Sequence, residues 1–207
     1  SSAASDVYKR QSYDFILALA MPLTVGLIFT SPSVILLLSG ESFAPAILTS
    51  QIVALNILMV GISGVMGLQV LYPMGRINIV ILCTFIGAVV NVVLNVLLIP
   101  VYGHNGTAVA YMLAEVAVTV SMFIIGRRYI PIQFFKKEHL HYVLGSVVMG
   151  GCLYILSQFY LGSMKTLVVM IIAGCLVYTL ILLALKNSIS TIILKMIKRS
   201  FIERRTF

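Results

Sequence analysis

The chain has 207 residues, of which 60% are hydrophobic and only 10% are charged, and its mean hydropathy is +1.09. A soluble domain carries about 25% charged residues, so this composition excludes a water-soluble globule and makes a lipid bilayer the solvent. The formal net charge of +8 then has to be explained either by membrane topology or by binding of an acidic partner.

Six apolar runs are each close to the ~20 residues that a helix needs to cross a bilayer. None shows the strict alternation of a membrane β-strand, so we expect an all-α polytopic membrane protein. The expected helices are Phe15–Leu38, Ala46–Leu71, Ile77–Ile99, Thr107–Ile125, Tyr142–Tyr160 and Leu167–Leu185. Pro22 and Pro32 are expected to kink the first helix. The stretch Pro100–Gly106 is expected to connect the third helix to the fourth.

Basic residues lie almost entirely on one side of these helices. Of the 14 Lys and Arg residues, only Lys165 falls in a connection on the opposite side. The others are Lys9, Arg10, Arg76, Arg127, Arg128, Lys136, Lys137, Lys186, Lys195, Lys198, Arg199, Arg204 and Arg205. The positive-inside rule predicts that this side, with both ends of the chain, faces the cytoplasm. Topology therefore explains the net charge, and no nucleic-acid partner is needed.

The two ends of the chain differ from its centre. Residues 1–11, SSAASDVYKRQ, resemble a translated sequencing adapter, so we expect a non-native leader and a chain that is a C-terminal fragment. A six-helix transporter domain is expected over residues 12–185 and a cytoplasmic tail over residues 186–207. The tail predicts a basic amphipathic helix on the membrane surface, with docking to a partner as the alternative. Its apolar face comprises Ile189, Ile192, Ile193, Met196, Ile197 and Phe201.

Polar residues inside membrane helices are costly, so their positions are informative. Three expected helices carry a polar or small face whose members recur at helical spacing. These faces are Asn56, Ser63 and Gly67 on the second helix; Thr84, Gly87, Asn91 and Asn95 on the third; and Tyr111, Glu115 and Thr119 on the fourth. The last two helices carry few such residues, so we expect them to be peripheral.

Two interpretations of these faces stay open. Small residues and amide hydrogen bonds hold membrane helices together, each bond contributing about 1 kcal/mol; alternatively, the faces line a polar cavity. The glycines favour packing, and Asn91 and Asn95 fit either interpretation. Glu115 lies roughly 12 Å into its helix, where a carboxylate needs water, a cation or a donor, or else protonation and a structural contact. The candidate cavity residues are Asn56, Gln69, Asn91, Asn95, Tyr111 and Glu115, with Arg76 at the cytoplasmic mouth.

No catalytic or metal-binding constellation is visible in the sequence. His104 lies in a short outer connection, and His139 and His141 lie in a basic loop without acidic residues at metal spacing. The three single cysteines, Cys83, Cys152 and Cys175, are interpreted as apolar core residues. We therefore expect neither an enzyme nor a cofactor. A membrane polysaccharide polymerase or acyltransferase, the alternative enzyme class, would need a large external loop, and a purely structural subunit would not need Glu115.

The motif N-x-x-x-N-x-x-L-I-P-x-Y-G-x-x-G-T-A-x-A, from Asn91 to Ala110, resembles bacterial Wzx-type polysaccharide flippases. These are members of the multidrug/oligosaccharidyl-lipid/polysaccharide exporter superfamily. LALAMPLTVGL, LLLSGESFAPA and GLQVLYPMGRINI occur in the same order as in that family. The resemblance covers residues 12–185, and Glu115 falls where such sequences often have an acidic residue.

This resemblance implies 12 to 14 helices in two lobes around a central cavity, in the bacterial inner membrane. Such proteins flip undecaprenyl-pyrophosphate-linked oligosaccharides by alternating access. The chain would be the last six helices of a 14-helix member, and its partners would be the lipid-linked oligosaccharide, membrane lipids, the missing N-terminal lobe and, as an open alternative, a coupling cation. A drug/cation antiporter or a peptidoglycan-precursor flippase is the alternative within the superfamily.

Overall fold

The computed structural model describes residues 2–129, 136–159 and 164–187, and its regular elements are all helices. Six segments are long and apolar enough to cross a membrane, which confirms the expected all-α, six-span architecture. The elements are α1 (Ser2–Ser39), η1 (Glu41–Phe43), α2 (Ala46–Ala54), α3 (Asn56–Gly64), η2 (Val65–Leu71), α4 (Ile77–Tyr102), α5 (His104–Gly126), α6 (Lys137–Ser157) and α7 (Met164–Ala184). The predicted amphipathic tail lies outside the described residues, and the predicted leader stays a prediction.

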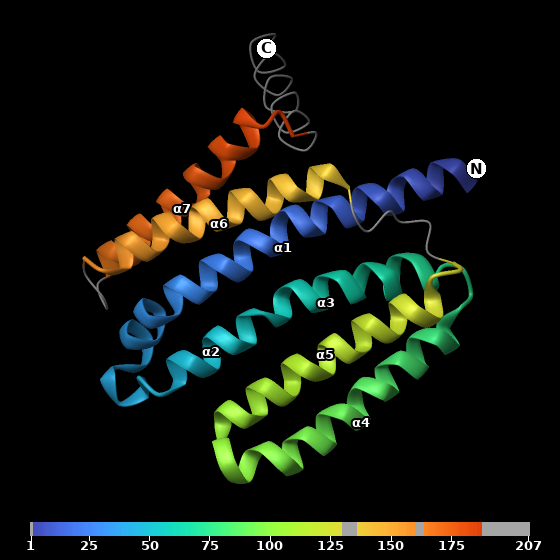
Figure 1. The fold of residues 1–207 in the computed structure, drawn as a ribbon, viewed down its shortest axis with the longest axis horizontal. Helices are drawn as coiled ribbons and strands as arrows, with labels where there is room; N and C mark the ends of the chain where they lie inside the picture. Colours follow the sequence, from blue (N-terminus) through green and yellow to red (C-terminus); the bar gives the residue numbers. More distant parts are fainter. Residues whose placement is uncertain (1, 130–135, 160–163, 188–207) are drawn as a thin grey trace, which may run out of the picture.

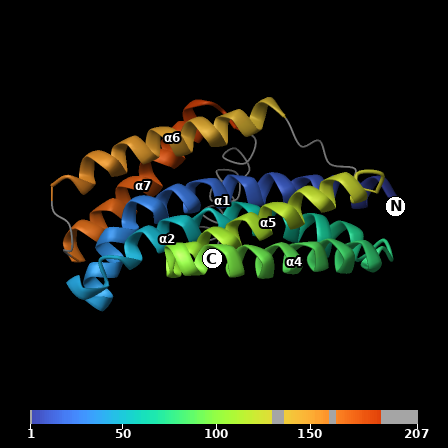
Figure 2. The same cartoon turned by 60° about the horizontal axis from the view of Figure 1, so that its bottom comes forward.

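Helix α1 is the centre of the arrangement. It lies between the pair α6–α7 on one side and the group α2 to α5 on the other (Figures 1 and 2). Its 38 residues make it about 57 Å long, well beyond the ~30 Å of a hydrocarbon core. The contacts of α6 and α7 are principally with α1 and with each other, as the peripheral position of the last two expected helices requires.

Both prolines of α1 lie inside a helix that continues past them. A proline cannot donate a backbone hydrogen bond, so Pro22 frees the carbonyl of Ala18 and Pro32 frees that of Ile28. Neighbouring helices supply the missing donors. The Tyr178 hydroxyl on α7 donates to the Ala18 carbonyl at 2.7 Å, and Gln51 Nε2 on α2 donates to the Ile28 carbonyl at 3.0 Å. Proline chemistry thus fixes where α7 and α2 attach to α1.

The second span has the predicted ends, Ala46 and Leu71, but its interior is irregular. Helix α2 ends at Ala54 and α3 begins at Asn56, while the final turns form the π-helical segment η2. The wide turn closes with the Tyr72 amide donating to the Gly67 carbonyl at 2.9 Å. Gly67 packs against Met122 of α5, whose Cε would lie 3.3 Å from an added Cβ. Such π-helical turns are rare overall, and those that occur are often located at functional sites.

The predicted Pro100–Gly106 connection is shorter than expected. Helix α4 continues through Pro100 to Tyr102, and Gly103 alone separates it from α5. Gly103 reverses the chain with a positive φ of 54°, which glycine adopts readily. Pro100 falls in the last turn of α4, so it removes a single bond near the helix end and does not stop the helix.

The two helices of this hairpin cross closely because both carry glycines. A Cβ on Gly106 would lie 2.5 Å from the Leu98 carbonyl oxygen, and one on Gly87 would lie 2.2 Å from Val118 Cγ2. These contacts are those of small residues that let membrane helices approach. The packing interpretation therefore holds for Gly87, but it is wrong for Gly64, where an added Cβ would meet nothing within 4 Å.

The fifth span begins earlier than predicted. Helix α6 covers Lys137–Ser157, so His139 and His141 lie in its first turns and the expected loop position is wrong. The predicted start at Tyr142 followed the apolar run alone. The helix includes these residues, and Lys136 and His139 at its start contact Asp14 of α1, as described below.

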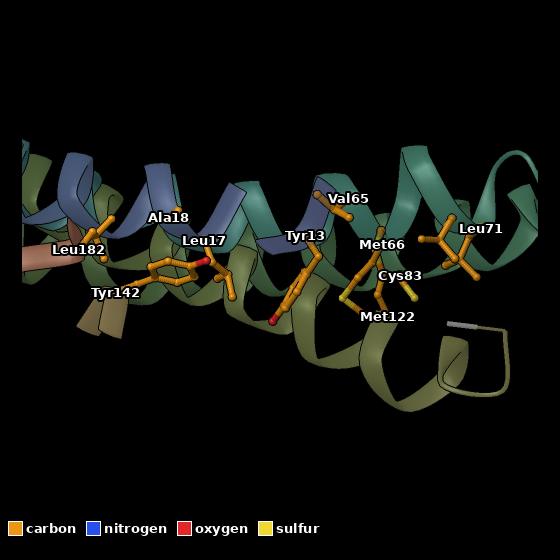
Figure 3. Packing of buried hydrophobic residues seen from close by; sticks show 11 residues of the cluster. Tyr13, Leu17, Ala18, Val65, Met66, Leu71, Cys83, Met122, Tyr142 and Leu182 are labelled. Carbon is orange, nitrogen blue, oxygen red and sulfur yellow. The ribbon is translucent and has the colours of Figure 1, made fainter. Parts of the chain in front are cut away.

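The main hydrophobic core joins α1 to every other spanning segment (Figure 3). Met66 and Leu71 of η2, Cys83 of α4 and Tyr142 of α6 are fully buried within it. The cluster comprises Tyr13, Leu17, Ala18, Val65, Met66, Val70, Leu71, Cys83, Met122, Tyr142 and Leu182. Burial of Cys83 confirms its interpretation as an apolar core residue, whereas the same interpretation of Cys175 is wrong, because Cys175 is exposed.

Candidate functional site

Asn91 and Asn95 form one polar unit on α4. Asn95 Nδ2 donates to the Asn91 backbone carbonyl at 2.9 Å and to Asn91 Oδ1 at 3.0 Å. Both side chains are half-buried. Asn95 Oδ1 is buried and has no hydrogen-bond partner among the described residues. A buried acceptor without a donor is costly, so this pair has capacity left for a further donor or for a cation.

The α5 face lies beside this unit. The glycine contacts of the hairpin set an antiparallel register in which Asn91 is level with the turn between Tyr111 and Glu115. The Thr119 hydroxyl donates to the Glu115 carbonyl at 2.8 Å and lies 3.3 Å from the Met59 carbonyl of α3. Glu115 is half-buried and Tyr111 is 39% exposed. The fold therefore brings the predicted polar faces of α4 and α5 to the same level.

Asn56 has the least satisfied polar group of the predicted set. Its side chain is only 4% exposed, and neither amide atom has a hydrogen-bond partner within the part of the chain that the structure describes. It begins α3, directly after the irregular turn at Leu55. An amide in this state needs a group that these residues do not supply.

Two predicted residues lie apart from this group. Gln69 is exposed on η2, about 20 Å along the second span from Asn56. Arg76 is exposed at the start of α4, where its guanidinium carbon lies 4.4 Å from the centroid of the Tyr129 ring. That distance allows a cation–π interaction. The structure thus places Arg76 at one end of the bundle and does not place Gln69 with the other amides.

Sequence reasoning missed a polar cluster between α1 and α6. The Asp14 carboxylate accepts from Lys136 Nζ at 2.8 Å and contacts His139 Nε2 at 2.9 Å. His139 Nδ1 accepts from the Lys136 amide at 3.3 Å, which caps the first turn of α6. Tyr13 and Tyr142 flank the His139 ring, at centroid distances of 5.7 and 6.0 Å. A carboxylate just before the first apolar run and a basic stretch containing histidine were the only signals, and they lie 122 residues apart.

A cavity of about 780 Å³ opens beside this cluster, between α1, α3, α5 and α6. Its lining residues are Tyr13, Leu17, Met21, Leu58, Ile62, Met66, Thr119, Val120, Phe123, Lys136, Lys137, His139, Leu140 and Val143. A second cavity, of about 470 Å³, lies between α1, α6 and α7. None of the six predicted cavity residues lines either one, so those residues form a face and not the wall of a described cavity. Among the described residues, no three His, Cys, Asp or Glu side chains gather as a metal site.

Comparisons with known proteins agree on the type of protein. The family model "Lipid II flippase MurJ" matches residues 5–175. The fold is similar to a solved structure, "Lipid II flippase MurJ, inward closed conformation", with a TM-score of 0.75 and 18% sequence identity. That match covers 87% of this chain and 39% of the other, so the chain spans well under half of the solved protein. No curated protein matches.

These matches refine the expectation drawn from the sequence motifs. They confirm the exporter superfamily, in which lipid II flippases are placed. They do not support the Wzx-type assignment, because the family that matches is the one for the peptidoglycan precursor. The residues around Pro100 that suggested the Wzx type form the tight hairpin between α4 and α5.

Proposed function

The chain belongs to the lipid II flippase MurJ family, and from this premise we propose that it forms part of a transporter for a lipid-linked peptidoglycan precursor. The observation that carries the proposal is the family match over residues 5–175. The six apolar spans support a multi-pass position in the membrane. The export of oligosaccharide repeat units, and the drug/cation antiporter, are weaker proposals because no observation favours them.

The face formed by α3, α4 and α5 is the proposed contact with the transported polar head or with a coupling cation. Asn56 and Asn95 offer buried amide atoms without partners in the described chain, and Glu115 offers a carboxylate at the level of Asn91. Amides suit hydroxyl and amide groups of a saccharide or peptide, and a carboxylate suits a cation. Alternating access between this group of helices and a second lobe would expose the face to each side in turn.

A pyrophosphate needs cations, and this face holds few. Between Ala46 and Gly126 the only Lys or Arg is Arg76, at the end of the bundle. We propose that Arg76 meets the precursor where it enters, on the cytoplasmic side that the basic loops indicate. Further cations for the pyrophosphate would come from other parts of the transporter.

Exchange of Glu115 for Gln in the full-length transporter tests the site. It removes the charge but keeps the shape, so a carboxylate that binds the cargo or a cation predicts a loss of export of tenfold or more, the effect of about 1.4 kcal/mol. The measurement is the fraction of lipid II that a membrane-impermeant degrading enzyme cleaves from outside cells that depend on the transporter.

The matched control is Glu41→Gln, in the short connection between α1 and α2. It removes the same charge from an exposed position and is expected to leave export unchanged. Unchanged export in Glu115→Gln at equal protein level would make Glu115 a structural residue. Export of an oligosaccharide repeat unit, with no movement of lipid II, would instead overturn the assignment of the cargo.

A further inference from the structure

The cavity between α1, α3, α5 and α6 has two chemically different ends. Lys136, Lys137 and His139 lie at one end, on the first turns of α6. Apart from Thr119, the walls beyond are apolar or aromatic, and Tyr13, Leu17 and Met66 among them are seen side by side in Figure 3. No acidic residue is among the described residues that line it. Such a site matches an amphiphile whose charged end is anionic.

The depth of the cavity is that of one leaflet. On α1 the lining extends from Tyr13 to Met21, and on α3 and η2 it extends from Leu58 to Met66. Eight residues of helix are about 12 Å long, close to half of a ~30 Å hydrocarbon core. The volume of about 780 Å³ also falls within the usual range for small-molecule sites. An acyl chain of one leaflet therefore fits, with its headgroup at the lysines.

The lysines are held in place by α1. Asp14 binds Lys136 at 2.8 Å and His139 at 2.9 Å, and these groups are mostly buried, with side-chain exposures between 9% and 23%. The cluster fixes the start of α6, so Lys137 is presented at the mouth while its own side chain stays exposed. Packing between the two helices thus fixes the backbone at the charged end of the cavity, and Lys137 is the exposed cation there.

The charge balance selects the headgroup. Asp14 offsets one of the two lysines, and Glu138 follows on α6 without lining the cavity. Lys137 is the exposed lysine among the described residues that line this end, and a single lysine suits a single phosphodiester. The pyrophosphate of a lipid-linked precursor carries more negative charge than this end can balance.

We propose that this cavity holds a resident phospholipid with a singly charged anionic headgroup, such as phosphatidylglycerol. The lipid fills the space between the α1–α6 pair and the α3–α5 pair, with its phosphate at Lys137 and a chain against Leu17, Ile62 and Val143. It is a constituent of the bundle and not the transported cargo, so the inference does not depend on the proposed function.

Photolabelling of the full-length transporter in nanodiscs tests the proposal. A photoactivatable phosphatidylglycerol is compared with a phosphatidylcholine of the same chains, and the labelled peptides are mapped. In the wild type, phosphatidylglycerol is expected to label the cavity walls about fivefold more, the factor given by ~1 kcal/mol per lysine near an anionic lipid. Lys137→Gln is expected to remove this preference, whereas Lys165→Gln, at the exposed start of α7, leaves it unchanged.

A second pair of variants tests the walls. Val143→Phe fills the cavity and is expected to lower labelling by both lipids, while Val148→Phe, exposed on the same helix and outside both cavities, does not. If Val143→Phe does not fold, Val120→Phe fills the space from α5. Equal labelling by the two lipids, or labelling that Lys137→Gln does not change, would overturn the proposal. Displacement of the probe by an equimolar lipid-linked pyrophosphate would also overturn it, by making the cavity a cargo site.

Discussion

In α1, the backbone carbonyls that prolines leave without a helical donor accept hydrogen bonds from neighbouring helices. On α3 and α4, in contrast, buried side-chain amides have no partner within the described residues. Tyr178 and Gln51 bind the carbonyls that Pro22 and Pro32 release. Asn56 and Asn95, in contrast, keep buried amide atoms unbonded. Unbonded hydroxyls occur in α1 as well, at Thr24 and Ser33, but an amide that must satisfy both a donor and an acceptor is the greater cost.

This difference distinguishes polar groups that stabilise the fold from polar groups that are candidates for binding. A polar group that meets its partner inside the chain stabilises the fold, and its cost of burial is offset there. A buried group without such a partner lowers stability, and it is retained where something outside the described chain binds it. The proline-associated contacts of α1 are therefore structural, and the face of α3 to α5, with its unbonded amides, is the one proposed to be functional.

The largest expected effect belongs to the glycine crossing that holds the functional face together. In Gly106→Ala the new Cβ would lie 2.5 Å from the Leu98 carbonyl oxygen, and forcing α4 and α5 apart costs about 2–3 kcal/mol. Denaturant unfolding of the reconstituted chain measures the loss. Gly64→Ala, where an added Cβ meets nothing within 4 Å, is the control and is expected to gain up to ~1 kcal/mol. Equal stability of the two variants would show that the hairpin relaxes freely.

A smaller loss is expected on the structural side of the comparison. Tyr178→Phe removes the hydroxyl that binds the Ala18 carbonyl at 2.7 Å, and the orphaned carbonyl of a proline-containing helix costs about 1 kcal/mol. The same unfolding measurement applies, with export in the full transporter expected to be unchanged. Tyr154→Phe, at a tyrosine 57% exposed on α6, serves as the reference and should not alter stability. Loss of export at wild-type stability would show that Tyr178 has a role in transport and not only in the fold.

The smallest effect on stability is expected for Asn56→Leu. Unlike the two preceding variants, it is expected to keep or raise the stability. Since neither amide atom has a partner in the described residues, an apolar side chain of similar size should leave stability unchanged or raise it by up to ~1 kcal/mol. Export should fall in the same variant. Asn105→Leu provides the contrast, because Asn105 Oδ1 accepts from Thr49 at 2.6 Å and its loss should destabilise the chain. Destabilisation of Asn56→Leu by more than 1 kcal/mol would mean that its amide is bonded after all.

Most of the fold follows from the sequence because apolar runs determine where helices cross. The second span ends at Ala46 and Leu71 as predicted, since charged or turn residues bound it on both sides. Its inner irregularities at Leu55 and η2 were not predicted, because the apolar run continues through both of them without a change of pattern. The start of α6 was also missed, since Asp14 is far away in the sequence.

The candidate site was predictable in part. The spacing of Asn91 and Asn95 correctly indicated a shared face, but the hydrogen bond between the two side chains within α4 was not predicted. That Asn56 lacks a partner, and that Gln69 points away, depend on the packing of α3 and η2, which periodicity alone does not reveal. The role of the predicted residues in transport stays a prediction.

The single-residue turn at Gly103 leaves no flexible loop between α4 and α5 that could take up additional residues. An epitope tag or a reporter domain inserted there would have to unwind one of the two helices and shift the contact of Gly106 with Leu98. The connection between Gly40 and Pro45 is longer and exposed, and so is the natural place for such a label. Changes of length during the evolution of this chain should likewise be found at Gly40–Pro45 and not at Gly103.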